Sequence, residues 1–368
     1  MTPIVELNPP FLTLEKIWTT LYPSISYISI QEQAELFIQL SNDFNISNTI
    51  TLNTIMERLE KIKLYRNALK TLQELPKMEQ RTEEWYSMRR NMLTASDLAS
   101  AIGKGKFSSR KQLLQKKIAE VQGTSVKWNS NGIPALKWGI MYEDVAMRCY
   151  RAQRSNVVCH EFGLISHPNS TVPFGASPDG ITELGIMVEL KCPWKRKIEH
   201  GTVPEQYYYQ IQGQLEVCNL DECDYVECIL SEVPLEEYLN SNPGNNQHGA
   251  VLEWVNEKTN EVAYEYSIPT LHSPKDVMDW AEATAENRMN EEDSLQITTI
   301  HYWLLKDLHI IRVYRDRELW KTIELQIHEF WNDVQTGRIE PTVKSPDAKT
   351  YGYKKQKVIF RDDNESGV

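Results

Sequence analysis

The 368-residue sequence contains no uninterrupted apolar run of about 18 residues, the length that a membrane-spanning helix needs. It begins Met1-Thr2-Pro3, without the basic stretch and apolar block that mark a secretion signal. Six cysteines are too few for a secreted scaffold held together by disulfide bonds. These absences predict an intracellular protein of a reducing compartment that makes no contact with a membrane.

The eight histidines show neither the HxxxH nor the HExxH spacing, so zinc-hydrolase chemistry has no support in the sequence. The cysteines include no CxxC pair, and Cys218, Cys223 and Cys228 follow one another at intervals of five residues. An iron–sulfur cluster or a structural zinc site needs four suitably spaced ligands, and a fourth is not evident. We therefore expect neither.

Positive charge is also in short supply, because 40 Lys and Arg residues face 51 Asp and Glu residues, a net charge of -11. This balance argues against a protein that coats nucleic acid through bulk charge. The charge is uneven, however: residues 231–300 hold 14 acidic and 3 basic residues, whereas 81–120 hold 9 basic and 4 acidic ones. We expect a polyanion to bind near 81–120 or the basic run 191–197, and DNA to avoid the acidic segment. The alternative for each basic run is a solvated helix face.

The apolar pattern divides the chain into three predicted regions. Residues 1–78 form a helical N-terminal extension, because apolar residues recur at helical spacing with Glu and Lys between them. Residues 79–337 alternate between strand-like and helix-like runs, which predicts an α/β domain with an acidic, loop-rich insertion at about 231–300. Residues 338–368 are polar and are expected to form a flexible tail.

Within the α/β domain the expected helices occupy 85–90, 97–102, 141–151, 204–218 and 319–334. The second begins with Ser96 as its N-cap and stops at Gly103. The expected strands occupy 156–159, 162–166, 174–176, 185–190 and 224–230, with further strands within 302–313 and an inserted hairpin at 253–267.

The chemistry is concentrated in Ser177-Pro178-Asp179-Gly180, followed nine residues later by Glu189-Leu190-Lys191. On a strand, Glu189 and Lys191 project to the same face, and an adjacent strand can bring Asp179 beside them. Two carboxylates at one point repel each other unless a cation lies between them. Oxygen ligands of this kind suit Mg²⁺ or Mn²⁺, and the Leu190 carbonyl can add another. The alternative is a surface turn followed by a strand with a salt bridge.

The two motifs just described belong to a set of five short motifs that follow one another along the chain. They are Trp85 with Arg89 and Leu93-Thr94-Ala95-Ser96, Trp138 to Glu143, Ser177 to Gly180, Glu189 to Pro193, and Tyr208 to Gln212. In this order the sequence resembles the PD-(D/E)XK nuclease superfamily, and within it the branch of phage lambda exonuclease and the YqaJ viral recombinases. The resemblance covers about residues 81–230. It implies that 79–337 hold a restriction-endonuclease-like core, in which helices flank a central mixed sheet.

The resemblance also implies roles for individual residues. Asp179 and Glu189 would bind metal together with the Leu190 carbonyl, and Glu143 would help to hold a second ion. Lys191 would be the catalytic lysine, which orients or deprotonates the attacking water or stabilises charge on the phosphate. Gln210 would position the water or Lys191, and Gln206 and Gln214 lie on the same face of the expected helix.

A pocket for a 5′-phosphate is expected at Arg89, Thr94 and Ser96. The first amides of a helix have no partners within the helix, so the start of the short helix at Ser96 can bind an anion. Arg89 can add a planar, two-pronged donor. The alternative is a capping serine and a surface arginine, and either Arg89 or Arg90 could face the site.

The resulting hypothesis is a Mg²⁺-dependent deoxyribonuclease with two ions, for which Mn²⁺ can substitute. It degrades duplex DNA from the 5′ end in recombination or viral DNA processing, and acts in the host cytoplasm or nucleus if it is viral. Expected partners are double-stranded DNA, a single-strand annealing protein and further copies of the chain. The first alternative is an endonuclease or an RNA-degrading nuclease on the same core. The second is a non-catalytic nucleic-acid-binding module, which the presence of Asp179, Glu189 and Lys191 disfavours.

Overall fold

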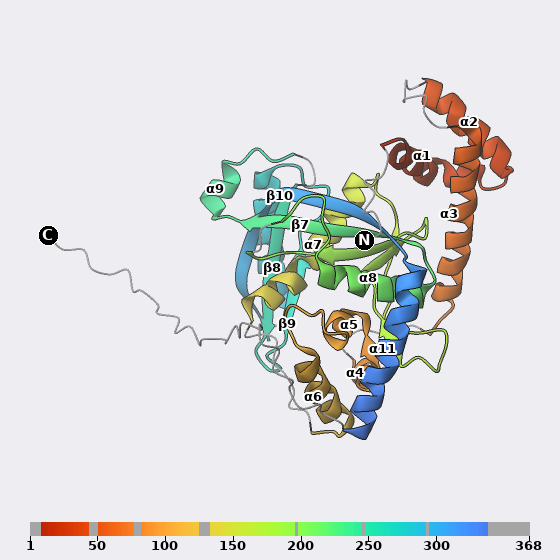
Figure 1. The fold of residues 1–368 in the computed structure, drawn as a ribbon. Helices are drawn as coiled ribbons and strands as arrows, with labels where there is room; N and C mark the ends of the chain where they lie inside the picture. The colour runs from red at the N-terminus through yellow and green to blue at the C-terminus, as the bar shows by residue number, and fades with distance from the viewer. Residues whose placement is uncertain are drawn as a thin grey trace.

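The structure is a computed structural model that describes residues 9–43, 51–76, 82–124, 133–195, 198–244, 247–291 and 294–337 (Figure 1). The tail predicted at 338–368 and part of the basic run 191–197 lie outside the described residues. No helix of the described chain is long and apolar enough to cross a membrane.

Three helices form the N-terminal part of the described chain: α1 (Pro9–Ile25), α2 (Ile30–Asp43) and α3 (Leu52–Gln73). Figure 1 shows them gathered at one end of the molecule. Their buried apolar residues, among them Trp18 and Leu59, pack in one cluster with Leu184 and Ile186 from the main sheet. The helical character predicted for this region is confirmed where the structure describes it, and the helices are joined to the sheet by a shared core.

A buried set of ion pairs, here called the docking network, ties these helices to the centre of the sheet. Arg312 donates to Asp224 Oδ1 over 2.6 Å and to Glu15 Oε2 over 3.2 Å, and it also bonds Glu222. Because each charge in it has a partner of opposite sign, the attraction between the partners offsets the large cost of removing these charges from water. Its members are Glu15 of α1, Arg58 of α3, Arg154, Glu222, Asp224 and Arg312.

The main sheet has seven strands in the order β2-β5-β6-β7-β10-β8-β9. Only β6 and β7 are parallel to each other, and the remaining neighbours are antiparallel, so the sheet is mixed as expected. The strands are β2 (Cys159–His160), β5 (Gly180–Thr182), β6 (Met187–Lys191), β7 (Glu222–Glu232), β8 (His248–Asn256), β9 (Val262–Tyr266) and β10 (Leu295–Tyr314).

Alternate residues of the central strands explain how helices cover both faces of the sheet. Met187 of β6 packs in one cluster with Ile211 of helix α8 (Glu205–Cys218), whereas the next residue, Val188, packs in another with Val145 of helix α7 (Pro134–Gln153). Successive strand residues point to opposite faces, so a strand such as β6, which is buried from Met187 to Leu190, requires cover on both sides. The predicted α/β class, with a mixed sheet flanked by helices, is confirmed.

A second, three-stranded sheet has the order β1-β4-β3 and lies beside a group of short helices. Its strands are β1 (Leu93–Thr94), β3 (Ile165–Ser166) and β4 (Phe174–Ala176), and the helices are α4 (Glu83–Arg90), α5 (Ala95–Ala101) and α6 (Arg110–Val121), with α11 (Arg317–Thr336) packed against them.

The prediction that Ser96 is an N-cap is wrong. Helix α5 begins at Ala95, its N-cap is Thr94, and no side chain caps it. The reason is that β1 runs directly into the helix at Thr94, which places Ser96 inside the first turn. Gly103 does follow the end of α5, with a positive φ of 78° that favours glycine.

The expectation of a loop-rich insertion at 231–300 is also wrong. This segment contains α9 (Leu235–Leu239), the β8–β9 hairpin, α10 (Pro274–Glu291) and the first part of β10, and it extends the main sheet. Strand β10 pairs with β8 from Leu295 onward and with β7 from Trp303 onward. The polar loop at 242–246 and the many acidic residues concealed the buried side chains of β8, such as Trp254.

Candidate active site

The strands β5 and β6 form a hairpin that carries the two central carboxylates. Asp179 directly precedes β5, and Gly180 pairs with Val188 on β6, next to Glu189. The Leu190 amide donates a hydrogen bond to Asp179 Oδ2 over 2.6 Å. The structure therefore brings Asp179 beside the Glu189-Leu190-Lys191 strand, and β5, which the sequence analysis missed, is the adjacent strand that does so.

Glu189 is 1% exposed, and both of its oxygens accept hydrogen bonds. Oε1 accepts from Gln210 Nε2 over 2.6 Å and pairs with the Lys191 ammonium, while Oε2 accepts from Gln214 Nε2 over 2.7 Å. Helix α8 thus presents Gln210 and Gln214, one turn apart, to the same carboxylate. The four-residue spacing of the two glutamines was the signal in the sequence for the contact of Gln214.

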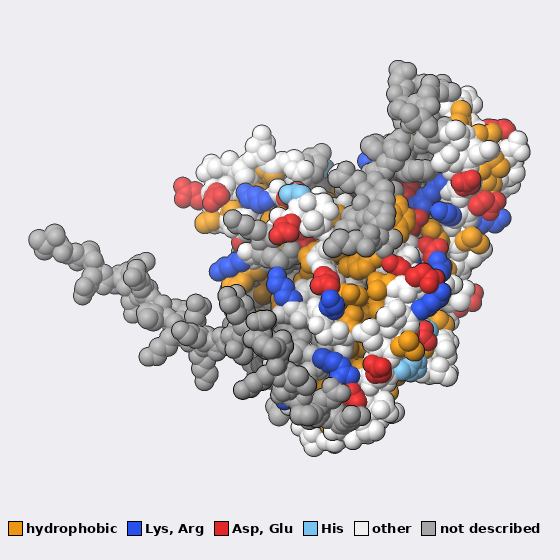
Figure 2. Space-filling view, in the orientation of Figure 1, with side chains coloured by type: hydrophobic (Ala, Val, Ile, Leu, Met, Phe, Trp, Pro, Cys, Tyr) orange, Lys and Arg blue, Asp and Glu red, His pale blue; other side chains and the backbone are white. Residues whose placement is uncertain are grey.

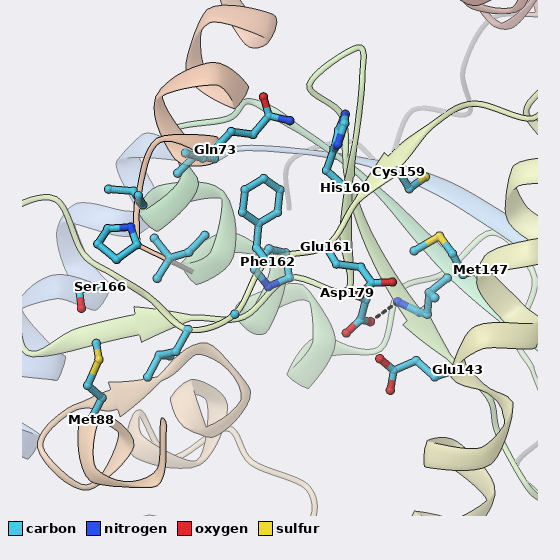
Figure 3. Close-up of a pocket in the computed structure, with 18 of the residues that line it drawn as sticks. Gln73, Met88, Glu143, Met147, Cys159, His160, Glu161, Phe162, Ser166 and Asp179 are labelled. Atoms are coloured by element: carbon cyan, nitrogen blue, oxygen red, sulfur yellow. Dashed lines mark hydrogen bonds between the residues drawn. The ribbon is translucent and has the colours of Figure 1, made fainter. Parts of the chain in front are cut away.

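Glu143 lies on α7 and lines the same cavity as Asp179 and Leu190. The cavity has a volume of about 920 Å³. Figure 3 shows the carboxylates of Glu143 and Asp179 directed toward the same space. Glu143, Asp179, Glu189 and Lys191 are here called the catalytic cluster.

The charges of the catalytic cluster do not balance, because three carboxylates face one ammonium. Burial, followed by the negative charges of Glu189 and Glu143, raises the pKa of Asp179 well above its ordinary value. Burial works to lower the pKa of Lys191, but the carboxylates of Glu189 and Asp179 outweigh it, so this pKa is raised. A negative excess of about two charges is the condition under which a divalent cation is stabilised.

The residues of the catalytic cluster fit such a cation, although one of them is already heavily engaged. A carboxylate offers about four acceptor positions, and Glu189 uses three of them for Lys191, Gln210 and Gln214. Among the residues that the structure describes, no three His, Cys, Asp or Glu side chains are grouped so that they could hold a metal ion. The oxygen donors of Glu143, Asp179 and Glu189 are of the type that a divalent cation prefers, but in this arrangement they do not form a complete metal site.

The residues predicted to bind a terminal phosphate also lie together. Arg89 Nη2 donates to Thr94 Oγ1 over 3.4 Å, and the hydroxyls of Thr94 and Ser96 are 3.1 Å apart. The guanidinium of Arg89 lies 4.4 Å from the centroid of the Trp85 ring. Arg90 instead pairs with Glu83 at 3.3 Å, so Arg89 is the arginine of this group.

Two further residues, Lys117 and Asp97, belong to this group. Neither contact is indicated by the sequence. Lys117 is 2% exposed and donates to the Arg89 carbonyl over 2.8 Å, and its distance of 28 residues from Arg89 hid the contact. Asp97 Oδ2 accepts from Thr94 Oγ1 over 3.3 Å. Burial lowers the pKa values of Arg89 and Lys117, against the opposing charges of Asp97 and Glu120.

The basic run at 81–120 is largely matched by acidic partners. Lys104 pairs with Glu205 at 3.4 Å, and Arg110 pairs with Asp333 at 2.7 Å. Figure 2 shows Lys and Arg side chains interspersed with Asp and Glu side chains on the face that it displays. Attraction for a polyanion therefore depends on local geometry in this region more than on a continuous basic surface.

All six cysteines are free thiols. Cys218, Cys223 and Cys228 are buried in the core, and Cys192 Sγ lies 3.4 Å from the Tyr142 carbonyl. The three buried cysteines pack in the core as small apolar side chains.

Residues 84–221 match the model of the YqaJ-like viral recombinase domain. This segment is similar to the YqaJ-like viral recombinase domain. It contains every residue of the catalytic cluster and of the Arg89 group, so the resemblance predicted from the motifs is confirmed. The three N-terminal helices and the strands β8 to β10 lie outside the YqaJ-like domain.

Two curated relatives are viral proteins. An uncharacterized protein of Acanthamoeba polyphaga mimivirus is 23% identical over 305 residues, which cover 72% of this chain and 54% of that protein. A protein of African swine fever virus is 27% identical over 164 residues, which cover 37% of this chain and 46% of that protein. The chain thus spans about half the length of the curated relatives that it matches.

Two solved structures are similar to the chain over most of their length. An alkaline exonuclease from Laribacter hongkongensis is 21% identical, with a TM-score of 0.43, and the match covers 70% of this chain and 94% of that one. A phage-related exonuclease from Haemophilus somnus is 14% identical, with a TM-score of 0.38, and the match covers 67% and 96% of the two chains.

Proposed function

We propose that this protein is a metal-dependent nuclease that hydrolyses phosphodiester bonds in DNA as an exonuclease. The observation that carries the proposal is the β5–β6 hairpin, which places Asp179 beside the paired Glu189 and Lys191, at a cavity lined by Asp179, Leu190 and Glu143. The YqaJ-like domain and the exonuclease titles of the similar structures support it.

The carboxylates of Asp179, Glu189 and Glu143, with the Leu190 carbonyl, would hold two Mg²⁺ ions, for which Mn²⁺ can substitute. Such ions supply Lewis-acid polarisation of the phosphodiester and offset the negative charge of the cluster. The protein itself contributes the spacing: the hydrogen bond from the Leu190 amide fixes Asp179, and three donors fix Glu189.

Lys191 is proposed to stabilise the negative charge that develops on the phosphate. Its ammonium pairs with Glu189, and this contact holds a positive charge beside the cavity that Asp179 and Leu190 line. Gln210 acts through Glu189, whose Oε1 it shares with Lys191, and so positions the ammonium. A preorganised donor of this kind contributes on the order of 10²–10³ in rate.

We further propose that cleavage starts at a 5′ end, with the terminal phosphate held by Arg89, Thr94 and Ser96. The side chains carry this proposal, since α5 has only seven residues and no side-chain cap. Removing a charged donor typically costs about 1.5–3 kcal/mol, or roughly tenfold or more in rate. The wild type should therefore degrade a 5′-phosphorylated duplex faster than a 5′-hydroxyl duplex, and Arg89→Ala should erase most of this difference. Arg90→Ala, which changes the neighbouring arginine, is the control.

Duplex DNA is the proposed substrate, and the viral relatives support action within a host cell during recombination or viral DNA processing. A single-strand annealing partner, assembly with further copies of the chain and the compartment of the host cell stay predictions.

The test uses end-labelled linear duplex DNA with Mg²⁺, alongside closed circular DNA and RNA. We expect loss of the linear duplex from its 5′ ends, no cleavage of the circle, and no activity when the metal is chelated. Asp179→Asn should abolish cleavage because it removes a charge from the cation site. Cleavage of the circle or of RNA would favour the endonuclease or RNA-degrading alternative, and full activity of Asp179→Asn would refute the assignment of the site.

A further inference from the structure

The N-terminal helix α3 is fitted closely to the turn of the catalytic hairpin. Gly185, in this turn, has a φ of 74°, and a Cβ atom there would lie 2.4 Å from Cβ of Tyr65 and 2.6 Å from its backbone carbon. Arg66 Nη1 donates to the Glu183 carbonyl over 3.0 Å, and its guanidinium lies 3.8 Å from the centroid of the Tyr22 ring. The close approach of Gly185 to Tyr65 and the hydrogen bond from Arg66 to Glu183 thus fix the position of α3 relative to the hairpin.

From this contact α3 runs on toward the cavity of the active site. Tyr65 and Gln73, the last residue of α3, are eight residues apart, a rise of about 12 Å along a helix, and Leu75 lies just beyond its end. Leu72, Gln73, Leu75 and Pro76 line the same 920 Å³ cavity as Asp179 and Glu143. The end of the N-terminal extension therefore forms part of the wall of the cleft that holds the catalytic cluster.

This part of the wall is uncharged and mostly apolar. Leu75 is 43% exposed and lines the cavity, so its apolar side chain is accessible to a ligand there. Phe162, from the segment between β2 and β3, lines the cavity as well, and in the view of Figure 3 its ring lies between Gln73 and Asp179. None of Leu72, Gln73, Leu75, Pro76 or Phe162 can hold a phosphate by charge, so a ligand at this wall is recognised by another property.

The two forms of DNA offer such a wall different surfaces. A duplex presents its phosphates outward and keeps the faces of its bases stacked inside, whereas an unpaired strand exposes the apolar π-faces of its bases. Bases stack on aromatic side chains regardless of their sequence. We propose that Leu75, Pro76 and Phe162 form a subsite for an unpaired nucleobase of the strand that enters the cleft. This inference rests on the proposed nuclease function and adds a role for the N-terminal extension, which lies outside the YqaJ-like domain.

The experiment measures binding separately from cleavage. The full chain carries Asp179→Asn, so that the strand stays intact, and a short single-stranded DNA carries 2-aminopurine, whose fluorescence falls when the base stacks. We expect quenching on binding, about tenfold weaker binding after Phe162→Ala, and about three- to tenfold weaker binding after Leu75→Ser.

Leu64→Ser is the matched control, because Leu64 lies on the same helix, is 65% exposed and does not line the cavity. It should change binding by less than about twofold. A strand with abasic sites in place of its bases keeps its phosphates, so the parent should bind it at least as weakly as Phe162→Ala binds the normal strand. On the abasic strand, Leu75→Ser and the parent should bind equally.

Equal binding of the normal and abasic strands by the parent would overturn the subsite, as would equal effects of Leu75→Ser and Leu64→Ser. Leu75 is exposed, so its variant tests the subsite even if Phe162→Ala fails to fold. Failure of the proposed function has a separate signature, namely that the wild-type chain cleaves no DNA while the base-dependent binding persists.

Discussion

The docking network and the catalytic cluster are two groups of charged side chains beside one sheet, and they differ in charge balance; the first is buried, whereas Glu143 of the second is exposed. In the docking network the carboxylates of Glu15, Glu222 and Asp224 meet three guanidinium groups. Burial alone would raise the pKa values of Glu222 and Asp224, but Arg312 foremost holds both at about 2. In the catalytic cluster, by contrast, burial and neighbouring carboxylates raise the pKa of Asp179.

The comparison shows that burial of charge does not by itself mark a functional site. A closed set of ion pairs holds elements together, and removing one partner leaves an uncompensated charge. A set with an excess of one sign is unstable until another ion joins it, which is the arrangement expected where a cation and a substrate bind. The pKa is lowered at Glu222 and Asp224 and raised at Asp179, and this difference in direction separates the two cases in this molecule.

The largest effect is expected from breaking the balance of the docking network. Arg312→Ala leaves three buried carboxylates short of a partner, and should lower the free energy of unfolding by about 3–5 kcal/mol. Urea denaturation measures this loss. Arg317→Ala removes an arginine that is 58% exposed and pairs with Asp221, and should change stability by less than about 0.5 kcal/mol. A loss below about 1 kcal/mol for Arg312→Ala would mean that the network does not dock the N-terminal helices.

The second prediction removes the one positive charge of the catalytic cluster. Lys191→Ala should lower turnover by about 10²–10³, since the ammonium acts on charge in the transition state. Metal affinity, followed by titration with Mn²⁺, should stay nearly unchanged or rise, because the excess of negative charge grows. A parallel loss of metal affinity and turnover would instead assign Lys191 a structural role.

A third change should act in opposite directions in the two groups. In the presence of a chelator, Asp179→Asn relieves repulsion and should raise the free energy of unfolding by roughly 0.5–2 kcal/mol, as is common for residues kept for function. Asp224→Asn removes a charge that Arg312 and Arg154 both use, and should destabilise the protein. The comparison fails if both variants shift the unfolding midpoint in the same direction.

The smallest effect concerns His301, which lies between two carboxylates away from both groups. Its Nδ1 lies 3.1 Å from Glu232 Oε1 and its Nε2 lies 3.0 Å from Glu253 Oε2. Burial works to lower the pKa of His301, but the two carboxylates outweigh it, so the folded-state pKa is raised. The resulting stability is complete below the unfolded pKa of about 6.5 and is lost as the pH rises through the folded value.

Because His301 is only partly shielded, the change should be on the order of 1 kcal/mol or less. Unfolding free energies measured from pH 6 to 9 should show this decline in the wild type. His301→Gln should remove it, and an unchanged slope in that variant would assign the decline to other groups.

The sequence was sufficient to predict the position of the carboxylates because the controlling contacts are local. Asp179 and Glu189 are ten residues apart on one hairpin, and the alternation along β6 decides which side chains share a face. The neighbouring contact of Gln214 follows from helical spacing. The family match confirms the motif order, while the roles of the individual residues stay predictions.

The features that were missed depend on contacts between distant parts of the chain. The bond between Lys117 and the Arg89 carbonyl, the place of Leu75 in the cleft and the pair of Glu15 with Arg312 join residues that no local pattern relates. The acidic segment was misread for a different reason, since its charge suggested solvent exposure although β8 is buried on both faces. The net charge of a segment therefore does not show which of its strands are buried.

The docking network also has a consequence for the time at which the molecule is completed. Glu15 and Arg312 are separated by 297 residues. At synthesis rates of about 5–20 residues per second, roughly 15–60 s pass between the emergence of the two. Through this interval the N-terminal helices lack their ion pair with Arg312 of β10, and the β5–β6 hairpin that they contact lacks the completed sheet. A growing chain thus contains Asp179, Glu189 and Lys191 well before β10, the strand that completes the docking network, has been made.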